Sequence, residues 1–131
     1  MALSAQLNPW APKVLSIVRI VAGLAFMAHG LGKHFGIPDL GFAVEAGSAG
    51  WIAGWIELIG GALIAIGLFT RLAAFICSGT MAAAYFMVHA PQNFYPATNG
   101  GEVAMLFCFI FFYFVFAGPG PWSVDAKMGK A

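Results

Sequence analysis

The acidic residue that most needs a physical explanation is Glu57, which lies within the apolar stretch from Gly50 to Arg71. Wound as a helix, this stretch has about the length of a bilayer's hydrocarbon core. Gly50, Gly54 and Gly61 are spaced so that they share one helical face with Glu57. An ionised carboxylate that faces acyl chains is costly, whereas glycines let a second helix approach closely. We therefore expect Glu57 to face the interior of a helix bundle.

Four more ionisable residues can be placed relative to Glu57 from the helical rise of about 1.5 Å per residue. Arg19 falls about 9 Å above the inner end of the first apolar helix, and His29 falls about 24 Å above it. Glu57 falls about 18 Å above the inner end of the second helix. Lys33 and Glu102 then lie near the outer rim. These heights predict a polar track with Lys33 and Glu102 at the rim, His29 below them, Glu57 deeper and Arg19 deepest.

This polar track has a functional and a structural interpretation. In the first, Glu57 and His29 are the candidate catalytic residues, because a buried carboxylate and a histidine can exchange protons near neutral pH. The track is then a proton path, or a polar pocket for the head group of a quinone or a similar apolar molecule. In the second, Arg19 and Glu57 neutralise one another and lock the first two helices together, while His29 is a packed core residue and Glu102 caps a helix. Both interpretations stay open from the residues alone.

The composition shows which solvent surrounds these residues. The chain of 131 residues is 61% hydrophobic and 8% charged, whereas soluble globular domains carry about 25% charged residues. Residues 72–88 include no charged residue, so the polar stripe of a soluble helix bundle is missing there. The net charge of +1 is small and spread out, which argues against a nucleic-acid partner. We expect an all-α protein that forms one membrane domain over residues 1–131.

Helix signals divide this domain into four apolar segments. Ser48 and Thr70 are expected to cap the second and third helices, and Pro91 to stop the third. Asn99 and Glu102 stand at the spacing of a capping box for the fourth. The sequence thus predicts a four-helix transmembrane bundle with helices at about 13–34, 49–69, 71–89 and 101–117.

Basic residues predict how this bundle is oriented. One side of the four-span arrangement carries five of them, and the other side carries Lys33 alone; the five are Lys13, Arg19, Arg71, Lys127 and Lys130. Because cytoplasmic loops are enriched in lysine and arginine, both termini are expected in the cytoplasm. The protein is accordingly expected to be a multi-pass protein of the inner cell membrane.

No cofactor or metal site can be built from sequence motifs. Cys77 and Cys108 lie in apolar segments without CxxC spacing, which favours buried, inert thiols over a redox pair. The chain contains no CxxCH, no GxGxxG after a strand and no four-cysteine set, so haem, flavin and iron–sulfur clusters are not predicted.

Short blocks of sequence, in their order and spacing, resemble the DoxX family of small bacterial and archaeal membrane proteins. The resemblance extends from about Ile17 to Asp125, and its blocks are Arg19 to Gly23, His29 to Lys33, Glu57 to Gly61, Gly67 to Ala74, Asn99 to Glu102 and Gly118 to Asp125. Pro121 departs from the pattern, since the family often has a basic residue there.

The resemblance implies four transmembrane helices and a link to membrane redox chemistry, because the family name is shared with a small subunit of a thiosulfate:quinone oxidoreductase. It implies an accessory subunit of a quinone-linked electron-transfer complex that is not expected to catalyse alone. Expected partners are membrane lipid and other membrane subunits, and expected ligands are a quinone or a bound lipid. The alternatives are a purely structural subunit of a larger membrane assembly, and a transporter of a small solute or protons.

Overall fold

The computed structural model describes residues 2–131, and every regular element in that part of the chain is helical. The predicted all-α class is therefore confirmed. In chain order the elements are α1 (Ala2–Leu7), the 3-10 turn η1 (Asn8–Trp10), α2 (Ala11–Phe35), α3 (Ala49–Ile66), α4 (Thr70–Ala84), the π-helical turn η2 (Tyr85–His89), α5 (Pro96–Asn99), α6 (Glu102–Ala117) and α7 (Val124–Lys127).

Three helical segments in the described chain are long and apolar enough to cross a membrane. They are Ala2–Phe35, Ala49–Ile66 and Thr70–His89, with 34, 18 and 20 residues. The fourth predicted span corresponds to α6, which is apolar but only 16 residues long. The count of four spans and the cytoplasmic position of both termini stay predictions.

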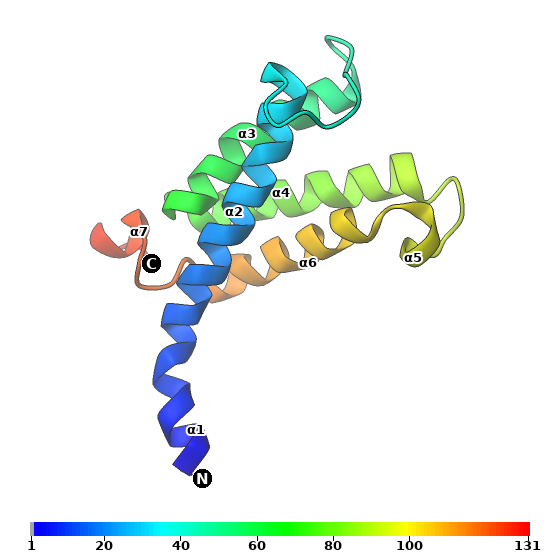
Figure 1. The fold of residues 1–131 in the computed structure, drawn as a ribbon. Coiled ribbons are helices and arrows are strands. Elements are labelled where there is room, and N and C mark those ends of the chain that lie inside the picture. Colours follow the sequence, from blue (N-terminus) through cyan, green and yellow to red (C-terminus); the bar gives the residue numbers. More distant parts are fainter. Residues whose placement is uncertain (1) are drawn as a thin grey trace.

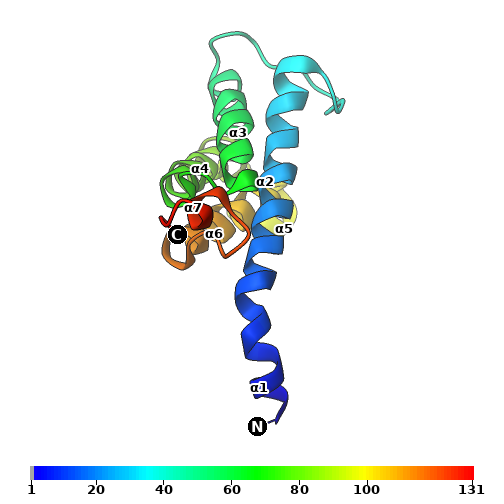
Figure 2. The same cartoon turned by 90° about the vertical axis from the view of Figure 1, so that its left-hand side faces the viewer.

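The long helices pack mainly in pairs. α2 packs along α3, α4 packs along α6, and α3 also contacts α4 after a short turn, whereas α2 and α6 touch over a smaller area. The α4–α6 pair crosses α2 steeply, and the N-terminal part of α2 extends with α1 beyond the other helices (Figures 1 and 2). The contact between α2 and α6 is therefore less extensive than the α2–α3, α3–α4 and α4–α6 contacts.

Glycines bring α2 and α3 into backbone contact. A Cβ atom added at Gly23 of α2 would lie 2.5 Å from the backbone nitrogen of Ala65, and one added at Gly61 of α3 would lie 2.6 Å from that of Met27. Only hydrogen fits at such positions, as in other closely packed membrane helices. Glu57 shares the buried face of α3 with these glycines and is 3% exposed. The expectation that Glu57 faces the protein interior is confirmed.

The beginnings of α3 and α4 are capped in different ways. Ser48 caps α3 as predicted, because its Oγ accepts a hydrogen bond from the Trp51 N–H at 3.2 Å. The prediction that Thr70 caps the next helix is wrong, since Thr70 already lies in the first turn of α4. The cap comes from Asp125, whose carboxylate accepts the N–H groups of Phe69 and Thr70, each at 2.9 Å.

The predicted capping box at the start of α6 is also wrong. The N-cap of α6 is Gly101, which makes no side-chain cap bond. Asn99 belongs instead to α5, separated from α6 by the left-handed residue Gly100 (φ 76°). Its side-chain oxygen accepts the Gly101 N–H at 2.8 Å, and its amide donates to the Tyr85 hydroxyl at 3.1 Å. The turn at Gly100 removes the helical geometry that a capping box requires.

Candidate functional site

The strongest polar feature inside the helical core is an ion pair between α2 and α3. The ammonium of Lys33 lies 2.8 Å from Oε1 of Glu57 and donates a hydrogen bond to Oε2 at 3.1 Å. The two side chains are 14% and 5% exposed. A Cβ at Gly54 would lie 2.6 Å from Nε2 of His34 and 3.2 Å from Cβ of Lys33, so this glycine of α3 makes room for both side chains of α2.

This ion pair lines a cavity of about 350 Å³ between α3 and the end of α4. The only other polar side chain that lines it is Thr80, whose hydroxyl donates to the carbonyl oxygen of Ile76 at 2.9 Å. The remaining walls are apolar or glycine and consist of Ala49, Gly50, Ile52, Ala53, Ile56, Ala83, Ala84, Met87 and Val88. The cavity is therefore apolar except for a buried ion pair and one hydroxyl in its wall.

The π-helical turn η2 supplies one wall of the cavity. Met87 and Val88 of this turn line the cavity, while Tyr85 and His89 hold the following loop. The Tyr85 hydroxyl donates to the carbonyl oxygen of Phe94, and Nδ1 of His89 lies 3.1 Å from the carbonyl oxygen of Asn99. Single π turns inside helices are frequent at functional sites. Here the turn fixes the position of the cavity wall through the loop at 90–101.

Arg19 occupies a different site from Glu57. It is fully buried, and its guanidinium donates to the carbonyl oxygens of Pro119, of Trp122 at 2.6 Å and of Ala65 at 3.4 Å. Arg19 is level with Ala65, eight residues or about 12 Å along α3 from Glu57. The structural interpretation in which Arg19 and Glu57 neutralise one another is therefore wrong. Arg19 instead holds the C-terminal segment against the bundle.

The other two predicted site residues also lie outside the ion pair. His29 is half-buried, and its ring meets Phe107 of α6 edge-on with centroids 6.1 Å apart. Glu102 is exposed at the first position of α6. Neither side chain makes a hydrogen bond or ion pair with Lys33 or Glu57 in the described structure. Of the five residues in the predicted track, the fold brings together only Lys33 and Glu57.

Asp125 is a buried acid that the sequence did not mark as a site residue. Burial by itself raises the pKa of its carboxyl group, but the N–H groups of Thr70 and Phe69 and the charge of Lys130 outweigh burial. The pKa of Asp125 consequently lies below its ordinary value of 3.8. The residue acts as an ionised cap that ties α7 to the turn between α3 and α4.

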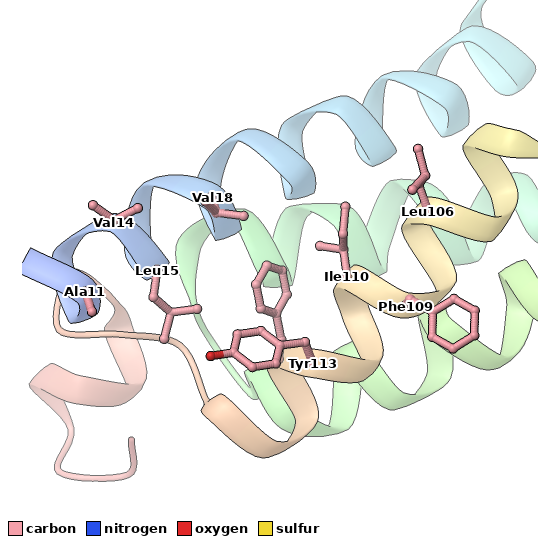
Figure 3. Close-up of a pocket in the computed structure, with 9 residues that line it drawn as sticks. Ala11, Val14, Leu15, Val18, Leu106, Phe109, Ile110 and Tyr113 are labelled. Atoms are coloured by element: carbon pink, nitrogen blue, oxygen red, sulfur yellow. The ribbon is translucent and has the colours of Figure 1, made fainter. Parts of the chain in front are cut away.

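Two further cavities are almost wholly apolar. The larger is a groove of about 510 Å³ between α2 and α6, in which Tyr113 is the only polar lining residue (Figure 3). The third, of about 230 Å³, lies between α3 and α4. No group of three or more His, Cys, Asp or Glu residues within 2–131 is placed to hold a metal ion. Of the three cavities described, the Lys33–Glu57 cavity is the one with charged residues among its lining residues, and charged groups in an apolar pocket are typical of ligand sites.

The fold and this cavity can be compared with known proteins. The model of the DoxX family matches residues 14–90, a range that includes every residue lining the Lys33–Glu57 cavity. The chain belongs to the DoxX family. It is a membrane protein with several apolar helices.

Curated relatives of this DoxX protein match it over nearly its full length. An uncharacterised protein of Haemophilus influenzae is 40% identical over 132 aligned residues, which cover 95% of this chain and 98% of the relative. An uncharacterised membrane protein of Mycobacterium tuberculosis is 24% identical over 163 aligned residues, covering 99% and 95% of the two chains. No solved structure matches this chain.

Proposed function

We propose that this DoxX protein is an accessory membrane subunit of a quinone-linked electron-transfer complex, and that it binds the quinone head group at the Lys33–Glu57 pair. The observation that carries the proposal is a buried ammonium–carboxylate pair whose two residues line an otherwise apolar cavity. A quinone matches this arrangement because it joins a small hydrogen-bonding ring to an apolar body.

The pair can recognise both redox forms of such a ring. The Lys33 ammonium can donate to a carbonyl oxygen of the quinone, and the Glu57 carboxylate can accept the hydroxyl of the quinol. Reduction of a quinone to a quinol takes up two electrons and two protons. In the proposed complex the two electrons come from a redox centre of a partner subunit and the two protons come from water outside the membrane, while Lys33 and Glu57 hold the ring and Glu57 passes a proton to its oxygen.

Stability alone does not account for the pair. A buried ion pair adds little net stability compared with well-packed apolar side chains, because both ions lose their hydration. Ionisable residues inside membrane segments are generally associated with ligand or proton pathways. A binding role for Lys33 and Glu57 therefore explains the presence of a buried ion pair in the membrane domain better than a structural role does.

Direct binding tests the head-group site. The protein in lipid nanodiscs is titrated with a decyl-substituted benzoquinone, and the wild type is compared with Glu57→Gln and Lys33→Met. We expect each variant to bind at least about tenfold more weakly, which corresponds to the loss of one charge-assisted hydrogen bond. Glu102→Gln, which removes an exposed acid outside the cavity, is the matched control and should bind as the wild type does.

Two outcomes would overturn the head-group site. One is wild-type affinity in both variants. The other is loss of binding only when Val14→Trp fills the larger groove between α2 and α6, because the ligand would then lie there.

A second experiment tests the accessory role. The chain is purified in mild detergent from native membranes, its partners are identified, and quinone-dependent electron transfer is measured. Glu57→Gln should leave the assembly intact and lower turnover. Intact assembly with normal turnover would favour a purely structural subunit, for which the exposed phenylalanines of α6 (Phe109, Phe112 and Phe116) provide a contact surface. Solute or proton flux in proteoliposomes that depends on Glu57 would favour transport instead.

A further inference from the structure

The Lys33–Glu57 cavity adjoins the third cavity, which we call the α3–α4 slot. The slot has a volume of about 230 Å³ and is lined by Trp55, Ile56, Ile59, Gly60, Leu63, Ala73, Ile76 and Cys77. Ile56 lines both spaces. On α4, the residues of the slot precede Thr80 and Ala84 of the polar cavity along the same helical side. The two spaces therefore follow one another along the α3–α4 interface.

Lys33 and Glu57 lie beside the place where the two spaces meet, because Glu57 directly follows Ile56 on α3. Beyond this place the slot is lined by apolar side chains, Gly60 and the thiol of Cys77. From Glu57 to Leu63 the slot follows six residues of α3, about 9 Å. A charged pair beside an apolar channel matches a molecule with a hydrogen-bonding ring and a long hydrocarbon tail.

The floor of the slot is closed where Cys77 packs against Gly60. A Cβ atom at Gly60 would collide with the sulfur of Cys77, so the buried thiol fills the space above this glycine and the slot is shallow there. Ile59 and Ile76 flank the slot and are 58% and 48% exposed. The slot is therefore narrow at its floor and open along its length, which suits a chain rather than a second ring.

We propose that the α3–α4 slot binds the hydrocarbon tail of the same molecule whose head group is held by Lys33 and Glu57. This inference rests on the proposed function and narrows its ligand class to quinones that carry a long apolar tail. The occupant follows from the position of the slot directly beside the Lys33–Glu57 cavity, with Ile56 as their shared wall. Each methylene that is buried there should tighten binding by up to about fourfold.

Paired ligands and paired variants test the tail site. Two benzoquinones with the same head, one with a methyl and one with a decyl substituent, are titrated into the protein in nanodiscs. Ile59→Trp fills the slot, and Ile66→Trp is the matched control, since Ile66 is on the same helix, is 51% exposed and lines no cavity that we describe. The ratio of the two affinities in each variant is divided by the wild-type ratio, so that membrane partitioning of the ligands cancels.

We expect Ile59→Trp to reduce the preference for the decyl compound by at least about tenfold, equivalent to the loss of two buried methylenes. The methyl compound should bind to this variant as it does to the wild type, and Ile66→Trp should change neither affinity. An unchanged preference in Ile59→Trp would overturn the tail site and favour an acyl chain of membrane lipid as the occupant. Equal weakening of both compounds would overturn it as well.

Failure of the tail site and failure of the proposed function give different results. If Glu57→Gln weakens both compounds while Ile59→Trp leaves the preference intact, the head-group site stands and the tail site is refuted. If Glu57→Gln affects neither compound, the proposed function itself is refuted. Melting temperatures of Ile59→Trp and Ile66→Trp should agree, which shows that the slot variant is folded.

Discussion

Removing the charges of Lys33 and Glu57, singly and together, should show that their effects on the free energy of unfolding are coupled. At 2.8 Å and an effective dielectric constant of about 20, the attraction between two unit charges is about 6 kcal/mol. Loss of hydration cancels much of this attraction, because each buried ion costs several kcal/mol to desolvate. The net contribution of the pair is therefore small, but the cost of leaving one ion alone is large.

The structure also predicts which single variant is more harmful. Lys33→Met leaves the carboxylate of Glu57, whose side chain is 5% exposed, without a partner and should lower the free energy of unfolding by about 3–5 kcal/mol. Glu57→Gln leaves the Lys33 ammonium, which is 14% exposed and has a long flexible stem. That ammonium can move toward water, so we expect a loss of only about 2 kcal/mol.

The double variant Lys33→Met with Glu57→Gln is the decisive measurement. It carries no buried charge, so its loss of stability should be smaller than the sum of the single losses by about 2 kcal/mol. The assay is denaturant unfolding of the purified protein in detergent, followed by far-ultraviolet circular dichroism. Additive losses within about 0.5 kcal/mol would refute the reasoning, because they would show that the two side chains do not interact.

Three more predictions concern the glycine contacts between helices, the Asp125 cap and the Arg19 contacts with the C-terminal segment. Gly61→Ala should destabilise the protein by about 1–3 kcal/mol, because the new Cβ meets the backbone of Met27. Gly79→Ala should stabilise the protein by about 0.5–1 kcal/mol, because a Cβ there has no neighbouring atom within 4 Å and alanine favours the helix. Equal melting temperatures of the two variants would contradict this prediction. Since Asp125 has a lowered pKa in the folded protein, its stabilisation is present above its ordinary pKa of 3.8 and lost as the pH falls through the folded pKa. The melting temperature of Asp125→Asn should therefore change less between pH 6 and pH 3 than that of the wild type, and parallel curves would argue against the cap. Arg19→Lys should speed hydrogen exchange at residues 118–125, because an ammonium cannot reproduce the fork of bonds to Pro119, Trp122 and Ala65; unchanged exchange would refute this role.

Features that depend on neighbouring residues could be predicted from the sequence. The apolar runs placed four long helices close to α2, α3, α4 with η2, and α6. Ser48 was correctly predicted as a cap because its partner, Trp51, is three residues away. Glu57 was correctly placed in the interior because the glycines that share its face lie on the same helix.

Features that depend on distant residues could not be predicted in this way. Nothing near Thr70 indicates that the carboxylate of Asp125, 55 residues later, takes the capping position. Asn99 has the spacing of a cap, but the left-handed turn at Gly100 directs it toward Tyr85. The heights of the ionisable residues along their helices also do not predict which of them form an ion pair, because height says nothing about the direction in which a side chain points. His29 points toward Phe107 of α6, and Lys33, one helical turn later, reaches Glu57.

The sequence by itself determined that this chain is a helical membrane protein and that one of its acids is buried, because apolar length and helical spacing are local properties. The tertiary structure alone decided that Lys33 neutralises Glu57 and that Arg19 binds the C-terminal segment. It also decided that the two residues of the ion pair line a cavity between α3 and α4. The physical reason is that these arrangements depend on how far α2 is shifted and rotated against α3, and backbone contact between glycines of the two helices fixes that shift.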